Sequence, residues 1–336
     1  MKILITGGLG FVGRRFARRF LATDDNEVLI IDNLQNGVPV EDWLFQPLHS
    51  DRLTVRQGDC RTYFRMHKFV PDMFDVVVHC AAIVGGRLNI DFNPLEVATN
   101  LSVDSEFFNW AVSGHHKPKV IYFSSSAVYP LEMQTCEWHI PLAESAVMFS
   151  GNYFAKPDRT YGFAKLAGEY LADFARNEYG LDVRIFRPFG GYGEDQDFNY
   201  PFPSIIRRVL NKEDPVTVWG SGDQERDFIY IEDIIDVVLD TLYTRSEITP
   251  LNLGTGIATS FVSLANRACS LLDVPSLIKP EPGKPEGVFS RVADVSKLRQ
   301  FWKKPFTPLD EGIRKVARAM QHVQKEKAGV ERQVAE

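Results

Sequence analysis

The chain has 336 residues, of which 44% are hydrophobic and 24% are charged, and its formal net charge is −6. This length is enough for a large and a smaller domain, and the composition is ordinary for a globular protein. The negative charge argues against a nucleic-acid partner, and no stretch approaches the roughly twenty apolar residues of a membrane span. The four cysteines lack the spacing of metal ligands. We therefore expect reduced thiols, no metal, no signal peptide and a cytoplasmic location.

The first elements are an apolar strand over residues 2–6, a glycine-rich turn and a helix from about residue 11 to 21. Gly7, Gly10 and Gly13 form a Gly-x-x-Gly-x-x-Gly pattern. The first glycine permits a tight turn, the second lets the backbone approach a pyrophosphate, and the third lets the helix pack close to the strand. The N-terminus of this helix would point at the phosphates, where its free N–H groups and its dipole favour negative charge.

A second apolar strand, residues 27–31, ends at Asp32, about twenty residues after the glycines. An acid at this place accepts hydrogen bonds from the adenosine ribose hydroxyls. Its carboxylate would repel a 2′-phosphate, so the sequence favours NAD over NADP. Arg14, on the first helix, could reach a cofactor phosphate. The order of strand, glycines, helix, strand and acid predicts a dinucleotide site.

Strands and helices go on alternating as far as residue 187. This alternation predicts a Rossmann-type α/β fold, a doubly wound parallel sheet with helices on both faces. Residues 131–160 are irregular and form a loop that leads to a further helix. The other expected elements are strands near 53–56, 75–80, 119–124 and 183–187 and a helix over about 94–112.

Proline and glycine become frequent after residue 187, which indicates a change of domain. We expect a dinucleotide-binding domain over residues 1–187 and a smaller α+β substrate-binding domain over 188–320. The chain is expected to return to the first domain near 231–242. Residues 321–336 are polar and are predicted to form a tail.

Three consecutive serines (124–126) follow the apolar strand near 119–124, and Tyr161 and Lys165 follow about forty residues later. A four-residue spacing puts the phenol and the ammonium on one face of a helix. The ammonium favours the phenolate, so Tyr161 could take a proton from an alcohol nearer neutral pH than a free phenol. A serine hydroxyl at the strand end could hold the same oxygen. This constellation suits acid–base chemistry on an alcohol.

These motifs together resemble the extended short-chain dehydrogenase/reductase superfamily, in its NAD-dependent sugar-nucleotide epimerase/dehydratase branch. The resemblance covers the chain from Met1 to about Lys315. It implies a nucleotide-diphosphate sugar as substrate, NAD as cofactor and a homodimer. Further segments that match the family are residues 58–59, 79–82, 187–193, 219–222, 226–233, 252–256 and 291–294.

The resemblance also implies roles for individual residues. Catalysis would involve Ser125, Tyr161 and Lys165, with Ser124 and Ser126 as alternatives for the serine. The cofactor would be bound by Gly7, Gly10, Phe11, Val12, Gly13, Asp32, Asn33, Asp59, Cys60, Ala81, Ala82, Asn100, Tyr161, Lys165 and Pro188. The substrate would be bound by Gly85, Gly86, Arg87, Ser126, Phe202, Trp219, Arg226 and Arg291. Of these, Arg226 and Arg291 suit the diphosphate, because a guanidinium can bind phosphate oxygens bidentately.

Departures from the family patterns narrow the reaction. Dehydratases and decarboxylases of the branch carry acidic residues where this chain has Ser126 and Ala127, so dehydration and decarboxylation are disfavoured. Epimerases acting at C3 and C5 carry a cysteine where Ala127 stands, although Cys136 and His139 could substitute. The reaction that remains is epimerisation at C4 through a transient 4-keto sugar.

Other features leave alternatives open. The Val84-Gly85-Gly86-Arg87 segment resembles a loop of GDP-fucose synthases and GDP-mannose 3,5-epimerases, so a GDP-sugar is an alternative to a UDP-sugar. Alternative functions are an NAD(P)H-dependent keto-sugar reductase, a GDP-sugar 3,5-epimerase and a non-catalytic dinucleotide-binding protein. The helices near 95–112 and 160–178 would form the dimer interface. Their apolar residues could face the partner or be buried; these are Phe107, Phe108, Trp110 and Tyr170.

Overall fold

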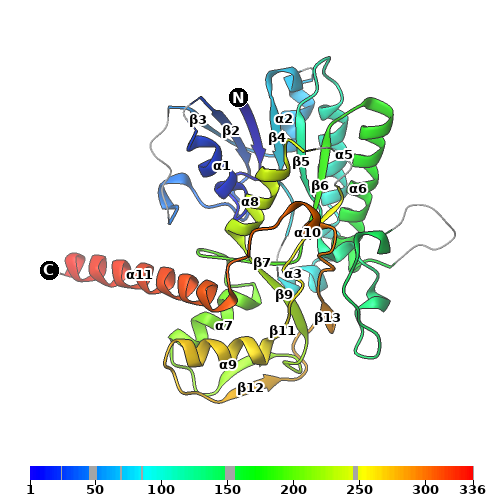
Figure 1. Cartoon of the computed structure of the whole chain (residues 1–336). Helices are drawn as coiled ribbons and strands as arrows, with labels where there is room; N and C mark the ends of the chain where they lie inside the picture. Colours follow the sequence, from blue (N-terminus) through cyan, green and yellow to red (C-terminus); the bar gives the residue numbers. More distant parts are fainter. Residues whose placement is uncertain are drawn as a thin grey trace.

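The computed structural model describes residues 1–23, 25–44, 51–68, 70–84, 86–147, 156–244 and 249–335, with side chains described up to residue 325. A seven-stranded sheet lies between helices, and a second group of short strands and helices lies beside it (Figure 1). The sheet consists of β1 (Lys2–Thr6), β2 (Glu27–Asp32), β3 (Leu53–Gln57), β4 (Val76–His79), β5 (Lys119–Phe123), β6 (Val183–Pro188) and β10 (Leu251–Leu253).

Every strand pair in this sheet is parallel, in the order β10-β6-β5-β4-β1-β2-β3. The predicted Rossmann-type fold is therefore confirmed. The strand order reverses between β1 and β4, and ligands of open α/β sheets bind outside the carboxyl ends of the strands at such a point. This topology directs attention to the segments that follow β1 and β4.

Alternate residues of each strand enter opposite layers. On β1, Ile3 and Ile5 join the cluster that contains α1 and α8, whereas Leu4 joins the cluster that contains α2, α5 and α6. Such strands are apolar on both faces, as parallel strands between two helical layers must be. The predicted helix over 94–112 is divided into two. The bounds of these helices are α1 (Gly13–Leu21), α2 (Cys60–Met66), α4 (Pro94–Val97), α5 (Asn100–Ala111), α6 (Arg159–Tyr179) and α8 (Ile231–Thr241).

The second group consists of a small mixed sheet, a two-stranded sheet and the helices that pack on them, whereas α3 (Arg87–Phe92) packs on α4 and α6, and α10 (Leu298–Phe301) packs on β10. The central strand β9 pairs with β7, β11 and β13, and β8 pairs with β12. The bounds are β7 (Gly190–Tyr192), β8 (Val216–Trp219), β9 (Glu225–Tyr230), β11 (Ala258–Ser260), β12 (Ile278–Glu281), β13 (Ser290–Arg291), α7 (Pro201–Leu210), α9 (Phe261–Leu271) and α11 (Leu309–Ala335). Short 3₁₀ helices span Val40–Asp42, Val70–Met73, Ser126–Val128, Leu131–Met133 and Glu144–Ala146.

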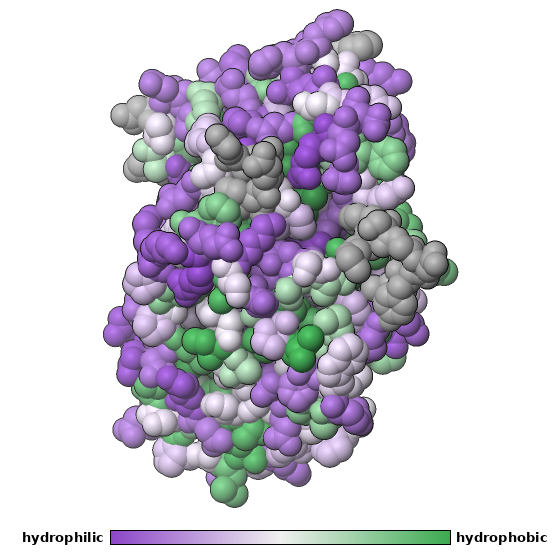
Figure 2. All heavy atoms as spheres, turned by 45° about the vertical axis from the view of Figure 1, so that its right-hand side comes forward, coloured by the Kyte–Doolittle hydropathy of each residue, from purple (hydrophilic) through white to green (hydrophobic). Residues whose placement is uncertain are grey.

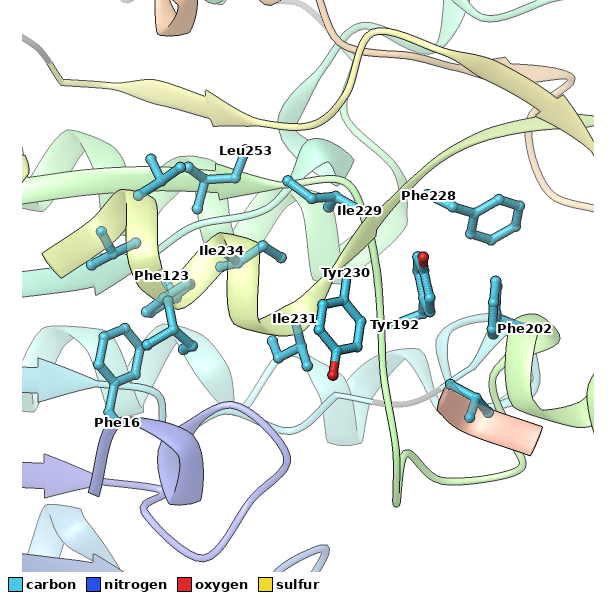
Figure 3. Packing of buried hydrophobic residues seen from close by; sticks show 14 of the residues in the cluster. Phe16, Phe123, Tyr192, Phe202, Phe228, Ile229, Tyr230, Ile231, Ile234 and Leu253 are labelled. Carbon is cyan, nitrogen blue, oxygen red and sulfur yellow. The ribbon is translucent and has the colours of Figure 1, made fainter. Parts of the chain in front are cut away.

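One cluster of buried apolar side chains connects the large sheet to the second group. Figure 3 shows Phe16 and Phe123 at one end of this cluster, Ile234 of α8 between, and Phe202 and Phe228 at the other end. The helix α8 packs on α1, and β10 extends the large sheet next to β6. The two parts of the molecule therefore meet along a continuous core.

The last helix, α11, extends away from the body of the molecule (Figure 1). It includes residues 321–335, for which the sequence predicted a polar tail. Figure 2 shows a face that is mainly hydrophilic, with hydrophobic patches in its lower part. No helix in the described residues is long and apolar enough to cross a membrane.

Candidate functional site

The glycine-rich turn after β1 packs tightly against itself and against the chain after β4. Gly7 has φ +66°, and a Cβ at this position would lie 2.7 Å from the backbone nitrogen of Ala81. A Cβ on Gly13 would lie 2.4 Å from the carbonyl oxygen of Gly7, so only glycine allows α1 to begin here. The first turn of α1 carries no acidic residue. Its free N–H groups and the positive end of its dipole can therefore bind an anion.

The carboxylate of Asp32 lies beside this turn. It accepts hydrogen bonds from the backbone N–H groups of Leu9 (3.0 Å) and Leu34 (2.8 Å), and the residue is 7% exposed. Burial raises the pKa of Asp32, although the two N–H groups oppose this shift. The remaining lone pairs can accept ribose hydroxyls, whereas a 2′-phosphate would be repelled. The residues at the end of β2 and in the glycine turn therefore fit NAD.

The sequence allowed Arg14 to reach a cofactor phosphate, and the structure shows the protein acceptors that it binds. Its Nε and Nη2 donate to the carboxylate and carbonyl of Asp195 at 3.0 and 2.9 Å, and Nη1 donates to the carbonyl of Leu9. Arg15 binds Asp195 as well, at 2.8 Å. Two arginines of α1 thus hold the chain after β7, and Arg14 is occupied by protein acceptors.

Two further residues expected beside the cofactor have well-defined protein partners. Asp59 is the N-cap of α2, and Arg61 donates to its carboxylate from the backbone and from the guanidinium at 2.6–3.1 Å. These hydrogen bonds lower the pKa of Asp59. Asn100 is buried and bonds both backbone polar groups of Ile83, at 2.7 and 2.9 Å. It thereby fixes the segment that contains Ala81 and Ala82.

The three serines after β5 have different partners. The Ser124 hydroxyl donates to Glu169, which also accepts two hydrogen bonds from the buried guanidinium of Arg187, at 2.8 and 2.6 Å. Ser125 accepts from the N–H group two residues further on, at 3.1 Å, so its O–H can still donate. Ser126 lines a cavity. Ser124 is therefore part of a buried ionic network, and Ser125 and Ser126 are the serines available for chemistry.

Tyr161 and Lys165 lie one turn apart near the start of α6. Tyr161 is half-buried and Lys165 is 3% exposed. The Nζ of Lys165 lies 5.1 Å from the centre of the Tyr122 ring, which belongs to β5. The phenol and the ammonium thus share a helix face at the carboxyl end of the strand that carries the serines.

A network of buried polar groups lies behind Lys165. Tyr122 donates to Asp104 at 2.6 Å, His79 Nε2 lies 3.2 Å from the other oxygen of Asp104, and His79 Nδ1 lies 2.7 Å from the hydroxyl of Thr6. Burial lowers the pKa of His79, so its ring is neutral. Burial alone would raise the pKa of Asp104, but Lys165 and the hydrogen bond from His79 bring it below its ordinary value. Asp104 is therefore the negative charge that faces Lys165.

A cavity of about 180 Å³ opens beside the serine turn. Four of the residues predicted to bind substrate line it: Ser126, Phe202, Arg226 and Arg291. Trp219, on β8, does not. The other lining residues are Phe189, Gly190, Gly191, Gln196, Tyr200, Pro201, Phe228 and Phe261.

Arg226 and Arg291 bring two guanidinium groups to this cavity. Arg291 donates from Nε to Gln134 at 2.7 Å and from Nη2 to Asp158 at 3.0 Å. Arg226 donates to backbone carbonyls, and in the described part of the chain no carboxylate pairs with it. Burial and the neighbouring charge of Arg291 lower the pKa of Arg226. An anion bound in the cavity would oppose both effects, because a nearby negative charge favours the charged guanidinium.

The glycine–arginine loop before α3 has a structural role. A Cβ on Gly86 would lie 2.1 Å from the carbonyl oxygen of Asn199, so glycine permits this close contact with the chain before α7. Arg87 donates twice to Asp91, at 2.7 and 2.6 Å, and once to Asp158, at 2.8 Å. Its guanidinium is therefore held by protein carboxylates. The other glycine, at position 85, lies outside the described residues.

Sequence reasoning missed Asp158, Gln134 and Gln196. An aspartate before a helix is a signal for an N-cap, yet the side chain of Asp158 makes no capping bond and binds two arginines instead. Gln134 lies in the irregular loop, where no pattern marks it. Gln196 is 8% exposed, lines the cavity and has an Oε1 without a partner among the described residues.

Comparison with known proteins agrees with this geometry. Residues 3–254 match the NAD dependent epimerase/dehydratase family. Over 321 residues the chain is 26% identical to a dTDP-4-dehydro-6-deoxy-D-allose reductase of a Streptomyces species, covering 94% of this chain and 95% of the relative. It is 28% identical to GDP-mannose 3,5-epimerase 1 of Oryza sativa subsp. indica, covering 94% and 80%.

A solved structure gives the same picture. The UDP-glucuronic acid 4-epimerase of Bacillus cereus, in complex with UDP-glucuronic acid and NAD, is 25% identical and superposes with a TM-score of 0.81. The match covers 96% of this chain and all of that structure. The family is NAD-dependent, in agreement with the predicted cofactor. Its relatives here include epimerases and reductases of nucleotide sugars. This chain belongs to the NAD-dependent epimerase/dehydratase family.

Proposed function

We propose that this protein is an NAD-dependent epimerase that inverts C4 of a UDP- or GDP-hexose through a transient 4-keto sugar. The observation that carries this proposal is the serine turn, which packs on α6 and whose Ser126 lines a cavity together with two guanidinium groups. Tyr161 also lies close enough to Arg291 for their charges to interact. A diphosphate on the arginines would bring the attached sugar to the alcohol chemistry of Tyr161.

Three residues of the chain would carry out the acid–base chemistry. The Tyr161 phenolate accepts the proton of the sugar hydroxyl, and the O–H of Ser125 holds the same oxygen. The Lys165 ammonium stabilises the phenolate. Bound NAD supplies the hydride chemistry, since its nicotinamide can accept a hydride from carbon and return it. Tyr161 then returns the proton after the ketone has turned in the cavity.

The residues after the catalytic serine support epimerisation at C4 over the other reactions. Ser126 and Ala127 supply no carboxylate for dehydration or decarboxylation. The substitutes considered for a 3,5-epimerase are Cys136, which is exposed, and His139, whose Nδ1 lies 3.2 Å from the Thr135 carbonyl. Both lie beyond the 3₁₀ helix Leu131–Met133 and not in the serine turn that contains Ala127.

The test is mass spectrometry of the small molecules released when the purified protein is denatured. Retained NAD, together with turnover of a UDP- or GDP-hexose into its C4 epimer, is the expected result. Release of no dinucleotide, with no turnover of either nucleotide sugar, would contradict the proposal. The base of a co-purifying nucleotide sugar would name the substrate series.

Reduction of a 4-keto sugar is the second candidate, because a relative that matches 94% of this chain is a keto-sugar reductase. The two functions differ in cofactor balance. A reductase consumes one NAD(P)H for each keto sugar, whereas an epimerase leaves the cofactor unchanged. Net oxidation of added NADPH or NADH by a nucleotide 4-keto sugar would select the reductase.

We also propose a cytoplasmic homodimer in carbohydrate biosynthesis that pairs through α5 and α6. Phe163, Tyr170 and Phe174 lie on one side of α6 and are 43%, 46% and 48% exposed. Phe107, Phe108 and Trp110 of α5 are buried, so α6 supplies most of the proposed apolar face. Light scattering of wild type and Phe174→Lys tests this, with a dimer and a monomer as the expected results.

A further inference from the structure

The backbone of Asp158 connects the serine turn to the helix of Tyr161. Its N–H donates to the carbonyl of Ala127 at 2.9 Å, and its own carbonyl accepts from the N–H of Gly162 at 2.8 Å. A Cβ on Gly162 would lie 2.2 Å from the Ala127 carbonyl oxygen, so the two segments are in close contact. Asp158 therefore stands at the junction between the two halves of the catalytic set.

The side chain of Asp158 faces the arginines. It is 3% exposed, and its Oδ2 accepts from Arg87 at 2.8 Å and from Arg291 at 3.0 Å. Burial alone would raise its pKa, but the charges of Arg291 and Arg87 hold the pKa of Asp158 below its ordinary value. Asp158 is thus a charged carboxylate that keeps two guanidinium groups side by side.

The residue that follows Asp158 shows how firmly this junction is fixed. Arg159 has φ +52°, a conformation that costs a residue other than glycine about 1–3 kcal/mol. Its Nε forms an ion pair with Asp91 at 2.8 Å, and Asp91 also binds Arg87. The strained backbone at the start of α6 is therefore held by the same network of ion pairs that holds Asp158.

One nitrogen of the Arg291 guanidinium has no hydrogen-bond partner among the described residues. Nε is bound by Gln134 and Nη2 by Asp158, whereas Nη1 makes no hydrogen bond within the described residues. Arg291 lines the cavity. A guanidinium held at two nitrogens has lost most of its rotamer freedom, so a phosphate oxygen can bind the third at little further entropic cost.

We propose that Asp158 is a positioning residue for the substrate diphosphate, because it fixes Arg291 relative to Tyr161 and the serine turn. This inference rests on the proposed function, since it requires a nucleotide-diphosphate substrate. Asp158 carries negative charge and would by itself repel a phosphate. Its removal, however, leaves Arg87 and Arg291 facing each other without their shared counter-ion, and Arg291 turns away from the cavity.

The test is a double-mutant cycle of Asp158→Asn and Arg291→Gln, with UDP and GDP as probes in titration calorimetry. Loss of one charged hydrogen bond predicts that Asp158→Asn weakens the tighter of the two nucleotides by about tenfold. If Asp158 acts through Arg291, the double variant binds no more weakly than Arg291→Gln alone. Retained NAD, measured after denaturation, is expected to be unchanged in all variants.

The matched control is Asp182→Asn. Asp182 also accepts from two cationic side chains, Lys119 and Arg184, but it lies at the opposite end of the sheet at the start of β6. Nucleotide affinity should not change in this variant. Asp158→Glu keeps the charge and should recover part of the lost affinity, which a purely structural role of the Asp158 site would not produce.

Two results would overturn the inference. Asp158→Asn could bind the nucleotide as tightly as wild type or more tightly, which would make the carboxylate a competitor of phosphate. The penalties of the two single variants could instead add in the double variant. Failure of the proposed function would appear as a wild type that binds neither nucleotide. Failure of the inference alone would appear as a wild type that binds a nucleotide with one of the two results above, so the two failures are distinguishable.

Discussion

Two groups of buried charged residues flank the proposed catalytic set, and they differ in how their charges are balanced. Behind Lys165, the carboxylate of Asp104 receives hydrogen bonds from Tyr122 and His79. Around the cavity, Arg291 pairs with Asp158, whereas Arg226 has no carboxylate partner among the described residues. The first group is complete within the chain. The second lacks negative charge, which identifies the side from which an anionic ligand would come.

Tyr161 lies between the two groups, and its removal should have the largest effect. A phenolate at this position would raise the pKa of Tyr122 in the first group and of Arg291 in the second. Tyr161→Phe removes only the proton-transferring hydroxyl, so we expect turnover to fall by about 10²–10⁴-fold. Retained NAD and nucleotide affinity should not change. Steady-state kinetics with the nucleotide sugar found by mass spectrometry measures this.

The matched control is Tyr179→Phe, at the exposed end of the same helix, where the side chain is 56% exposed. It should leave turnover unchanged. Full activity of Tyr161→Phe would contradict the proposed chemistry, because another group would then have to transfer the proton.

Arg187 belongs to a further buried ion pair, with Glu169, and tests whether complete pairing of buried charges matters for stability. Its ion pair with Glu169 is 1% exposed on both sides and bidentate. Arg187→Met leaves the carboxylate buried without its partner, so we expect the free energy of unfolding to fall by about 3–5 kcal/mol. The exposed pair of Lys304 and Asp240 is the control, because Lys304→Met should cost at most about 1 kcal/mol. Urea unfolding measures both, and equal losses would contradict the argument.

The sequence predicted the first strands, the glycine turn and the placement of Tyr161 and Lys165 on one helix, because each of these signals is local. Residues 2–6 and 27–31 are continuous apolar runs, and β1 and β2 occupy them. The glycines need no partner to be recognised, since φ at Gly7 and the close contacts at Gly13 follow from the turn itself. The spacing of Tyr161 and Lys165 likewise sets their position on one helix.

The arrangement of the arginines around the cavity depends on contacts between residues far apart in the sequence, which no local pattern contains. Arg291 meets Asp158 across 133 positions of the chain and Gln134 across 157. Arg87 is predicted to bind substrate, and its carboxylate partners lie four and 71 positions away. Arg14 could reach the cofactor, and its partner Asp195 lies 181 positions away. The positions of arginines follow from tertiary ion pairs, which the sequence does not reveal.

Single substitutions in the serine turn are expected to have smaller effects and can separate its catalytic, substrate-binding and structural serines. Ser125→Ala removes a donor to the reacting oxygen, and we expect turnover to fall by about a hundredfold. Ser126→Ala, at the cavity wall, should mainly raise KM. Ser124→Ala removes a partner of Glu169 and should lower stability with little effect on kinetics. Comparing kcat, KM and the urea midpoint of the three variants measures this, and a larger loss of turnover in Ser126→Ala would reassign the catalytic serine.

His79 provides the smallest expected effect. It tests whether the charges of the group behind Lys165 are balanced within the chain. Burial lowers the pKa of His79 below its unfolded value of about 6.5. Between these two values the unfolded chain binds a proton that the folded chain does not, so acid destabilises the protein. The free energy of unfolding should fall by about 1.4 kcal/mol for each pH unit below about 6.5, until the folded pKa is reached.

His79→Gln should remove this one-proton slope, which urea unfolding at pH 5.5, 6.0, 6.5 and 7.5 measures. Asp104 does not interfere, because its pKa in the folded chain is lowered and its contribution is lost only in more acidic solution. An unchanged slope in His79→Gln would mean that His79 is protonated in the folded chain. Its charge would then lie beside Asp104 and Lys165. The group behind Lys165 would carry an unbalanced positive charge, like the group of arginines around the cavity.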